Sequence, residues 1–129
     1  MTEQEMLNLR NQLVATAGAI QTNLNAIESK NQDAIEAEDE MQTVKQSLML
    51  DVMNQRFEIN NKLMYTNDDQ RKAALQIALD AHEDYQNLKS SRAVKIVEKV
   101  LLESEVEYKR KEFRANELLM LYYANNPTI

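Results

Sequence analysis

Residues 6–48 read MLNLRNQLVATAGAIQTNLNAIESKNQDAIEAEDEMQTVKQSL, and a hydrophobic or small residue recurs there at every seventh position. These positions are Met6, Leu13, Ile20, Ile27, Ala34, Met41 and Leu48. Such a repeat is typical of the side of a long helix that packs against another helix. The positions three residues further on are mixed in character: Leu9, Thr16, Asn23, Lys30, Ala37, Val44 and Asp51. Because Ala17, Leu24 and Val52 follow one residue later, we expect the apolar side to drift, as in a helical bundle.

Breaks in the pattern are few. The 129-residue chain contains one Gly, one Pro at position 127 and no Cys, so little in it favours a sheet or a fold with many turns. The composition, 43 % hydrophobic and 28 % charged, is that of a folded domain. We therefore expect a single domain over residues 1–129, with a first helix at about 3–55, an elbow at 56–66 and a second helix at about 67–124.

The elbow has two short apolar stretches on either side of the pair Asn60-Asn61. Asn accepts a positive φ, so this pair favours a short hairpin-like turn with two residues at its tip. The alternative is that the first helix continues to about Met64.

The second helix is predicted to begin near Thr66. Thr66 with Asp69, or Asn67 with Gln70, supplies a capping residue and a polar partner three residues later. One apolar face then runs through Ala74, Ala78, Ala81, Tyr85, Leu88, Val97, Leu101, Tyr108, Ala115, Leu118 and Tyr122. The segment Ser90-Ser91-Arg92 interrupts this face, as a kink, a shift of register or a solvated turn of helix.

The predicted fold class is all-α, with two long antiparallel helices. Each helix displays more apolar surface than one partner covers, so we expect a homodimer that forms a four-helix bundle. No charged residue occurs from Asn11 to Ile27, and Asn23 is suited to setting the register of a buried seam. The expected self-association face is Leu13, Ala17, Gly18, Ile20, Leu24 and Ile27; the alternative is a neutral, partly buried turn of the bundle.

Charge limits the partners. The net charge is −6, and residues 1–61 carry all of that excess. This balance argues against indiscriminate binding to nucleic acid. One basic cluster, Lys109, Arg110, Lys111 and Arg114, is a candidate contact for nucleic acid or a partner, with Tyr108 and Phe113 among its residues. Acids at helical spacing, such as Glu107 to Lys111, favour intrahelical ion pairs instead.

Candidate chemistry is sparse. His82 lies beside Glu83 and Asp84, but Leu79 stands where a Glu-x-x-His metal motif needs Glu. We expect an exposed structural histidine, and no catalytic residue, metal or cofactor. The acidic run Asp33–Glu40 suits a solvated helix face better than a mimic of nucleic acid or a cation site. Early acids at Glu3 and Glu5, and the lack of a long apolar run, predict a cytoplasmic protein without a membrane segment.

Four segments carry a family resemblance: 65–74 (YTNDDQRKAA), 83–85 (EDY), 105–108 (EVEY) and 113–115 (FRA). Across residues 57–123 the chain resembles small all-helical phage and prophage proteins encoded near recombination or single-strand-annealing genes. Thr66 replaces a usual Ser, and Asn60-Asn61 replaces Asn-Gly. The resemblance implies a non-enzymatic helical adaptor that contacts a recombination or host-defence protein. Alternatives are a nucleic-acid-binding accessory protein and a phage assembly or scaffold protein.

Overall fold

The computed structural model describes residues 2–126 and places in them the helices α1 (Glu3–Asn54), α2 (Asp68–Ala81) and α3 (Glu83–Asn125). The all-α class is confirmed, and α1 packs against α3. The chain divides into two compact units. Unit 1 combines the chain up to Asn31 with the chain from Val97 onwards, and unit 2 is Gln32–Ile96. No helix within residues 2–126 is long and apolar enough to cross a membrane.

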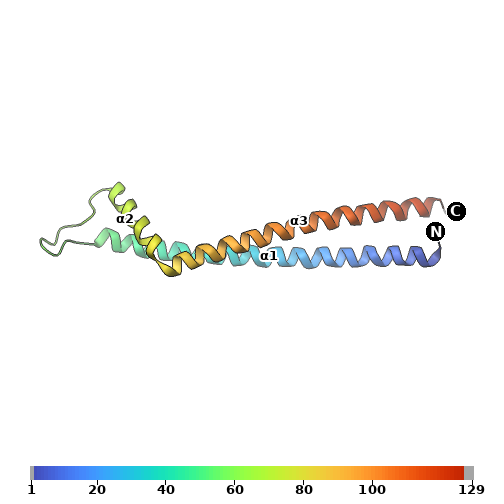
Figure 1. Ribbon diagram of the computed structural model, residues 1–129, viewed down its shortest axis with the longest axis horizontal. Coiled ribbons are helices and arrows are strands. Elements are labelled where there is room, and N and C mark those ends of the chain that lie inside the picture. Colours follow the sequence, from blue (N-terminus) through green and yellow to red (C-terminus); the bar gives the residue numbers. More distant parts are fainter. Residues whose placement is uncertain (1, 127–129) are drawn as a thin grey trace. The chain divides into compact units, whose positions relative to one another are not determined.

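Unit 1 is an antiparallel pair of helical segments, the blue part of α1 and the red part of α3 in Figure 1. Leu9 and Val106 are buried, at 6 % and 3 % exposure. Both helices enclose a seam whose spacing alternates between three and four residues. On α3 the enclosed residues are Leu102, Val106, Lys109, Phe113, Asn116, Met120 and Tyr123. This is the spacing of a coiled-coil seam.

The drift predicted along α1 is absent from most of the helix. Thr16, Asn23 and Lys30 are half-buried, whereas Ala17 is exposed. The heptad positions therefore stay on the packed side even where they are polar. The predicted neighbours do take part at Leu24, which is half-buried beside Asn23, and at the end of α1, where Val52 is buried and Asp51 is exposed.

Polar contacts join the two helices of unit 1. Lys30 forms an ion pair with Glu98, and the Lys99 Nζ donates a hydrogen bond of 3.2 Å to the Asn31 Oδ1. Both contacts join α1 to α3 beside a seam that mixes apolar residues with polar ones such as Asn23 and Asn116. Polar groups that meet in only one alignment help to set the register of paired helices.

Unit 2 holds most of the buried side chains. Within it, Ala34, Ala37, Met41, Val52, Leu75 and Leu79 are buried. Arg92 on α3 also forms an ion pair with Glu38 on α1, with 3.0 Å between Nε and Oε2. The helix α3 runs through Ser90 and Ser91 without interruption. The side chain of Asn67 caps α2 by accepting a hydrogen bond of 2.8 Å from the Gln70 backbone N–H.

The predicted second helix is broken at His82, which corrects the expectation of one helix over 67–124. His82 has extended backbone angles (φ −85°, ψ 109°), so α2 ends before it and α3 starts after it. Its Nδ1 accepts a hydrogen bond of 3.0 Å from the Tyr85 backbone N–H, and the Gln86 Nε2 donates to the Leu79 carbonyl at 2.9 Å. These bonds satisfy one free N–H at the start of α3 and add a donor to one carbonyl at the end of α2, without Pro or Gly.

The segment from Gln55 to Asn67 contains a hairpin-like loop. Arg56 and Leu63 form an isolated antiparallel bridge, and the Phe57 N–H donates to the Lys62 carbonyl at 2.9 Å. Asn61 adopts a positive φ of 55°, as the Asn pair suggested. The loop between Phe57 and Lys62 holds four residues, so the two-residue tip that we expected is wrong. Further helix to Met64 is excluded, because α1 ends at Asn54.

Candidate interaction surfaces

The outer face of α3 is the set of exposed residues in unit 1 at Val97, Leu101, Tyr108, Ala115, Leu118 and Tyr122. Leu101 is 64 % exposed and Tyr108 is 69 % exposed. Two heptad positions within this face are polar: Ser104, between Leu101 and Tyr108, and Lys111, between Tyr108 and Ala115. The face thus has coiled-coil spacing, but α1 does not cover it.

The sequence pattern had placed these residues on the apolar face of the second helix. In the structure, α1 packs instead against the neighbouring side of α3 that carries Val106 and Phe113. The two sides have similar hydrophobicity, so periodicity alone did not distinguish them. Each side carries two polar residues at its heptad positions, Lys109 and Asn116 on the packed side and Ser104 and Lys111 on the other.

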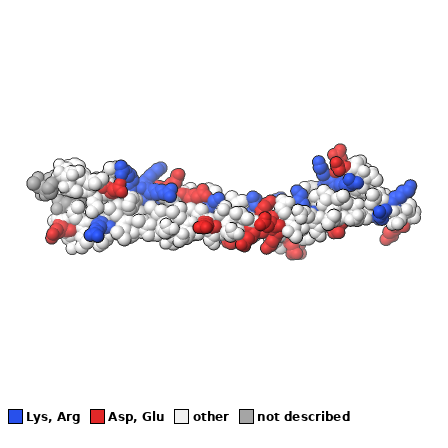
Figure 2. All heavy atoms as spheres, turned by 180° about the vertical axis from the view of Figure 1, so that it is seen from behind, with Lys and Arg blue, Asp and Glu red and all other residues white. Residues whose placement is uncertain are grey.

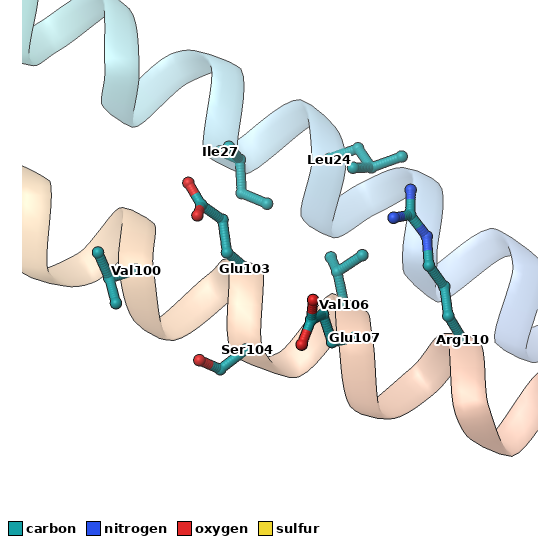
Figure 3. Close-up of a pocket in the computed structure, with 8 residues that line it drawn as sticks. All are labelled: Leu24, Ile27, Val100, Glu103, Ser104, Val106, Glu107 and Arg110. Carbon is teal, nitrogen blue, oxygen red and sulfur yellow. The ribbon is translucent and has the colours of Figure 1, made fainter.

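The predicted self-association face is divided in the structure. Leu13, Ile20, Leu24 and Ile27 are half-buried, whereas Ala17 and Gly18 are exposed. Figure 3 shows Leu24 and Ile27 on α1 facing Val106 on α3. Part of this face is therefore used within the chain, and the small residues remain open.

Replacement of Gly18 by Ala is expected to stabilise the protein by about 0.5–1 kcal/mol, because Ala is the better helix former. A Cβ at Gly18 would meet nothing within 4 Å, so the added methyl group causes no clash. Chemical denaturation followed by circular dichroism measures the change. The exposed substitution Ser29→Ala in the same helix serves as the control for propensity alone. Destabilisation by Gly18→Ala would show that another surface approaches this point closely.

A hollow of about 550 Å³ lies between the helices of unit 1 (Figure 3). Leu24, Ile27 and Val106 form its apolar wall, and its rim carries Glu103, Glu107 and Arg110. Arg110 extends from α3 toward α1 in this view. The lining offers charged, hydroxyl and apolar contacts.

The basic cluster at 109–114 is partly neutralised on its own helix. The Lys109 Nζ lies 3.0 Å from the Glu105 Oε1, and Arg114 pairs with Glu117. Intrahelical pairs therefore form as expected, with Glu105 and Glu117, whereas the specific pair of Glu107 with Lys111 is not among the ion pairs of the described residues. Figure 2 shows basic side chains gathered toward the C-terminal end of α3 with acidic side chains beside them. Lys111 is exposed, and Arg110 lines the hollow described above.

Glu105 connects this cluster with the seam. The Lys109 ammonium lowers the pKa of the Glu105 carboxyl, through a hydrogen bond and its charge, and the Asn23 amide lowers that pKa further. The Asn23 Nδ2 is buried and makes no hydrogen bond of ordinary geometry to any described residue. A buried amide without a partner destabilises a seam and disfavours other alignments.

His82 and the acidic run Asp33–Glu40, the remaining candidates for chemistry, take part in helix capping and in packing or ion pairs between helices. His82 is half-buried, which corrects the expectation of an exposed histidine, and its imidazole caps α3. In the acidic run Asp33–Glu40, Glu38 pairs with Arg92, and Ala34 and Ala37 are buried. Residues 2–126 contain no group of three or more His, Cys, Asp or Glu placed to hold a metal ion.

No protein-family model, no curated protein and no solved structure matches this chain.

Proposed function

We propose that this protein is a non-enzymatic helical interaction protein that dimerises through unit 1 into a four-helix bundle. The observation that supports the proposal is the outer face of α3, whose large side chains are 50–69 % exposed and follow heptad spacing. Exposed apolar residues aligned along one helix are typical of a surface that another helix covers. The interruptions at Ser104 and Lys111 would then restrict the alignment of the two copies.

The energetics favour a dimer of moderate affinity. Full burial of a large apolar side chain stabilises by about 1.5–3 kcal/mol, so covering a half-exposed one contributes roughly 1 kcal/mol. Val97, Leu101, Tyr108, Leu118 and Tyr122 from both copies together contribute about 10 kcal/mol, against an association cost of roughly 4–15 kcal/mol. At the low end of that cost the net gain is about 6 kcal/mol, which corresponds to a Kd of tens of micromolar, so we expect dimerisation at tens of micromolar protein or above rather than a permanent assembly.

The biological partner in this proposal follows from the resemblance to phage and prophage proteins. It is a protein of recombination or host defence, contacted in the cytoplasm. The ion pairs within the basic cluster favour a protein partner over nucleic acid, because paired lysines and arginines have less charge to offer a phosphate.

Light scattering in line with gel filtration tests the proposal. The chain is run alone, with single-stranded DNA and with duplex DNA, each at low and moderate salt. A dimer whose mass is unchanged by DNA supports the helical interaction protein. A monomer at all concentrations contradicts self-association. A DNA-bound species that dissociates with salt would instead favour the accessory protein and assign the contact to Lys109–Arg114.

A further inference from the structure

A separate groove of about 440 Å³ lies in unit 2 and is lined by residues of α1, α2 and α3. Three lysines line it, one from each helix: Lys45, Lys72 and Lys89. Its apolar lining includes Met49 and Tyr85, both half-buried. The groove is therefore lined by both positively charged and apolar side chains.

None of these three lysines forms an ion pair with a residue that the structure describes. The acid that lines the same groove, Asp80, accepts a hydrogen bond of 2.9 Å from the Gln76 amide. Three cations thus surround one hollow with a single carboxylate between them.

The sequence leaves two of these lysines without helical partners. The residues three and four positions from Lys45 and from Lys89 include no acid. Elsewhere acids are plentiful: the chain has 21 acids and 15 bases, and Lys99 and Lys109 each pair with a Glu four residues away. The three lysines are exposed, so solvent weakens their mutual repulsion, but with one carboxylate among the lining residues they leave the groove with a net positive charge.

We propose that this groove binds an acidic peptide segment of a partner protein, with carboxylates beside Lys45, Lys72 and Lys89 and a hydrophobic side chain over Met49 and Tyr85. Charge complementarity favours an anionic occupant. The apolar lining favours a peptide, because an acidic segment with Leu or Phe supplies both kinds of contact, whereas a nucleic acid backbone supplies only the charge. The inference relies on the proposed function only in that the partner is a protein, and it does not need the dimer.

Fluorescence anisotropy of a short labelled peptide that alternates Glu and Leu tests the groove on the full chain. The variant Lys45→Gln/Lys89→Gln removes two of the positive charges that line the groove. Its matched control, Lys62→Gln/Lys95→Gln, removes the same charge from unit 2 outside the groove. We expect the first variant to weaken peptide binding about tenfold or more and the control to change it less than threefold. Circular dichroism confirms that both variants are folded.

Three further probes separate the alternatives. A peptide with Ser in place of Leu should bind more weakly, and one with Gln in place of Glu should not bind; equal binding of either one contradicts the proposal. Equal losses in both lysine variants would show attraction to the whole surface and overturn it. Binding of labelled single-stranded DNA that is lost with Lys45→Gln/Lys89→Gln, without peptide binding, would reassign the groove to nucleic acid. Light scattering of the same samples reports dimerisation separately, so the two proposals fail independently.

Discussion

Replacement of Val106 by Asp is expected to unfold unit 1 at room temperature, or to lower its free energy of unfolding by at least about 4 kcal/mol. Val106 is 3 % exposed, the lowest value among the buried residues of the structure, and it faces Leu24 and Ile27. The substitution loses roughly 1.5 kcal/mol or more of apolar burial. It also places a carboxylate in the seam, which costs several kcal/mol more.

Helix content by circular dichroism and urea denaturation measure this loss. The matched control is Val94→Asp, because Val94 is 53 % exposed and receives the same charge on a helix surface of unit 2. Surface substitutions usually change stability by less than about 0.5 kcal/mol. If Val106→Asp were no more destabilising than Val94→Asp, the packing of α3 on α1 described here would be wrong.

The double substitution Leu101→Glu/Tyr108→Glu should convert the proposed dimer into a folded monomer. These two residues lie in the middle of the outer face of α3 and are 64 % and 69 % exposed within one chain. Their loss removes about 4 kcal/mol of burial from a symmetric dimer, and the four added carboxylates repel across the interface. A weakening of dimer affinity by more than about a thousandfold follows from this change.

Sedimentation equilibrium across a range of protein concentrations measures that shift. The control Ile59→Glu/Ile77→Glu adds the same charge at two exposed apolar residues outside unit 1, at 99 % and 70 % exposure. It should leave the dimer intact. A dimer that survives Leu101→Glu/Tyr108→Glu would place the contact elsewhere, with the open small residues Ala17 and Gly18 as the next surface to substitute.

The break between α2 and α3 at His82 could not be predicted from the local sequence pattern. From Gln70 to Ala124 the chain contains no Pro or Gly, and local propensity therefore predicts one helix. The structure ends α2 at Ala81 and caps α3 with an imidazole. Capping by His depends on the backbone angles that the residue adopts, and these follow from the packing of α2, whose Leu75 and Leu79 are buried in unit 2. Packing against distant residues thus overrides local propensity at this point.

The lysine-lined groove of unit 2 is a second feature that local sequence patterns did not predict. Lys45, Lys72 and Lys89 are 17 or more residues apart in sequence, and each has the appearance of an ordinary solvated lysine. Only the packing of three helices brings them to one hollow. The sequence shows that no acid lies at helical spacing from Lys45 or Lys89. This lack of ion-pair partners indicates a binding site only once the lysines are known to line one groove.

The sequence by itself determined the all-α class, the extent of α1 and the seam that α1 presents, because a heptad repeat without Pro defines a helix and its packed side through local geometry. It also limited the cap of α2 to Thr66 or Asn67 and indicated a positive φ in the pair Asn60-Asn61, because both features depend on side chains within a few residues; the structure selects Asn67 and Asn61. Only the tertiary structure decided which side of α3 meets α1, where α2 separates from α3, and which charges remain unpaired. These features depend on contacts between residues far apart in the chain, for which periodicity carries no information.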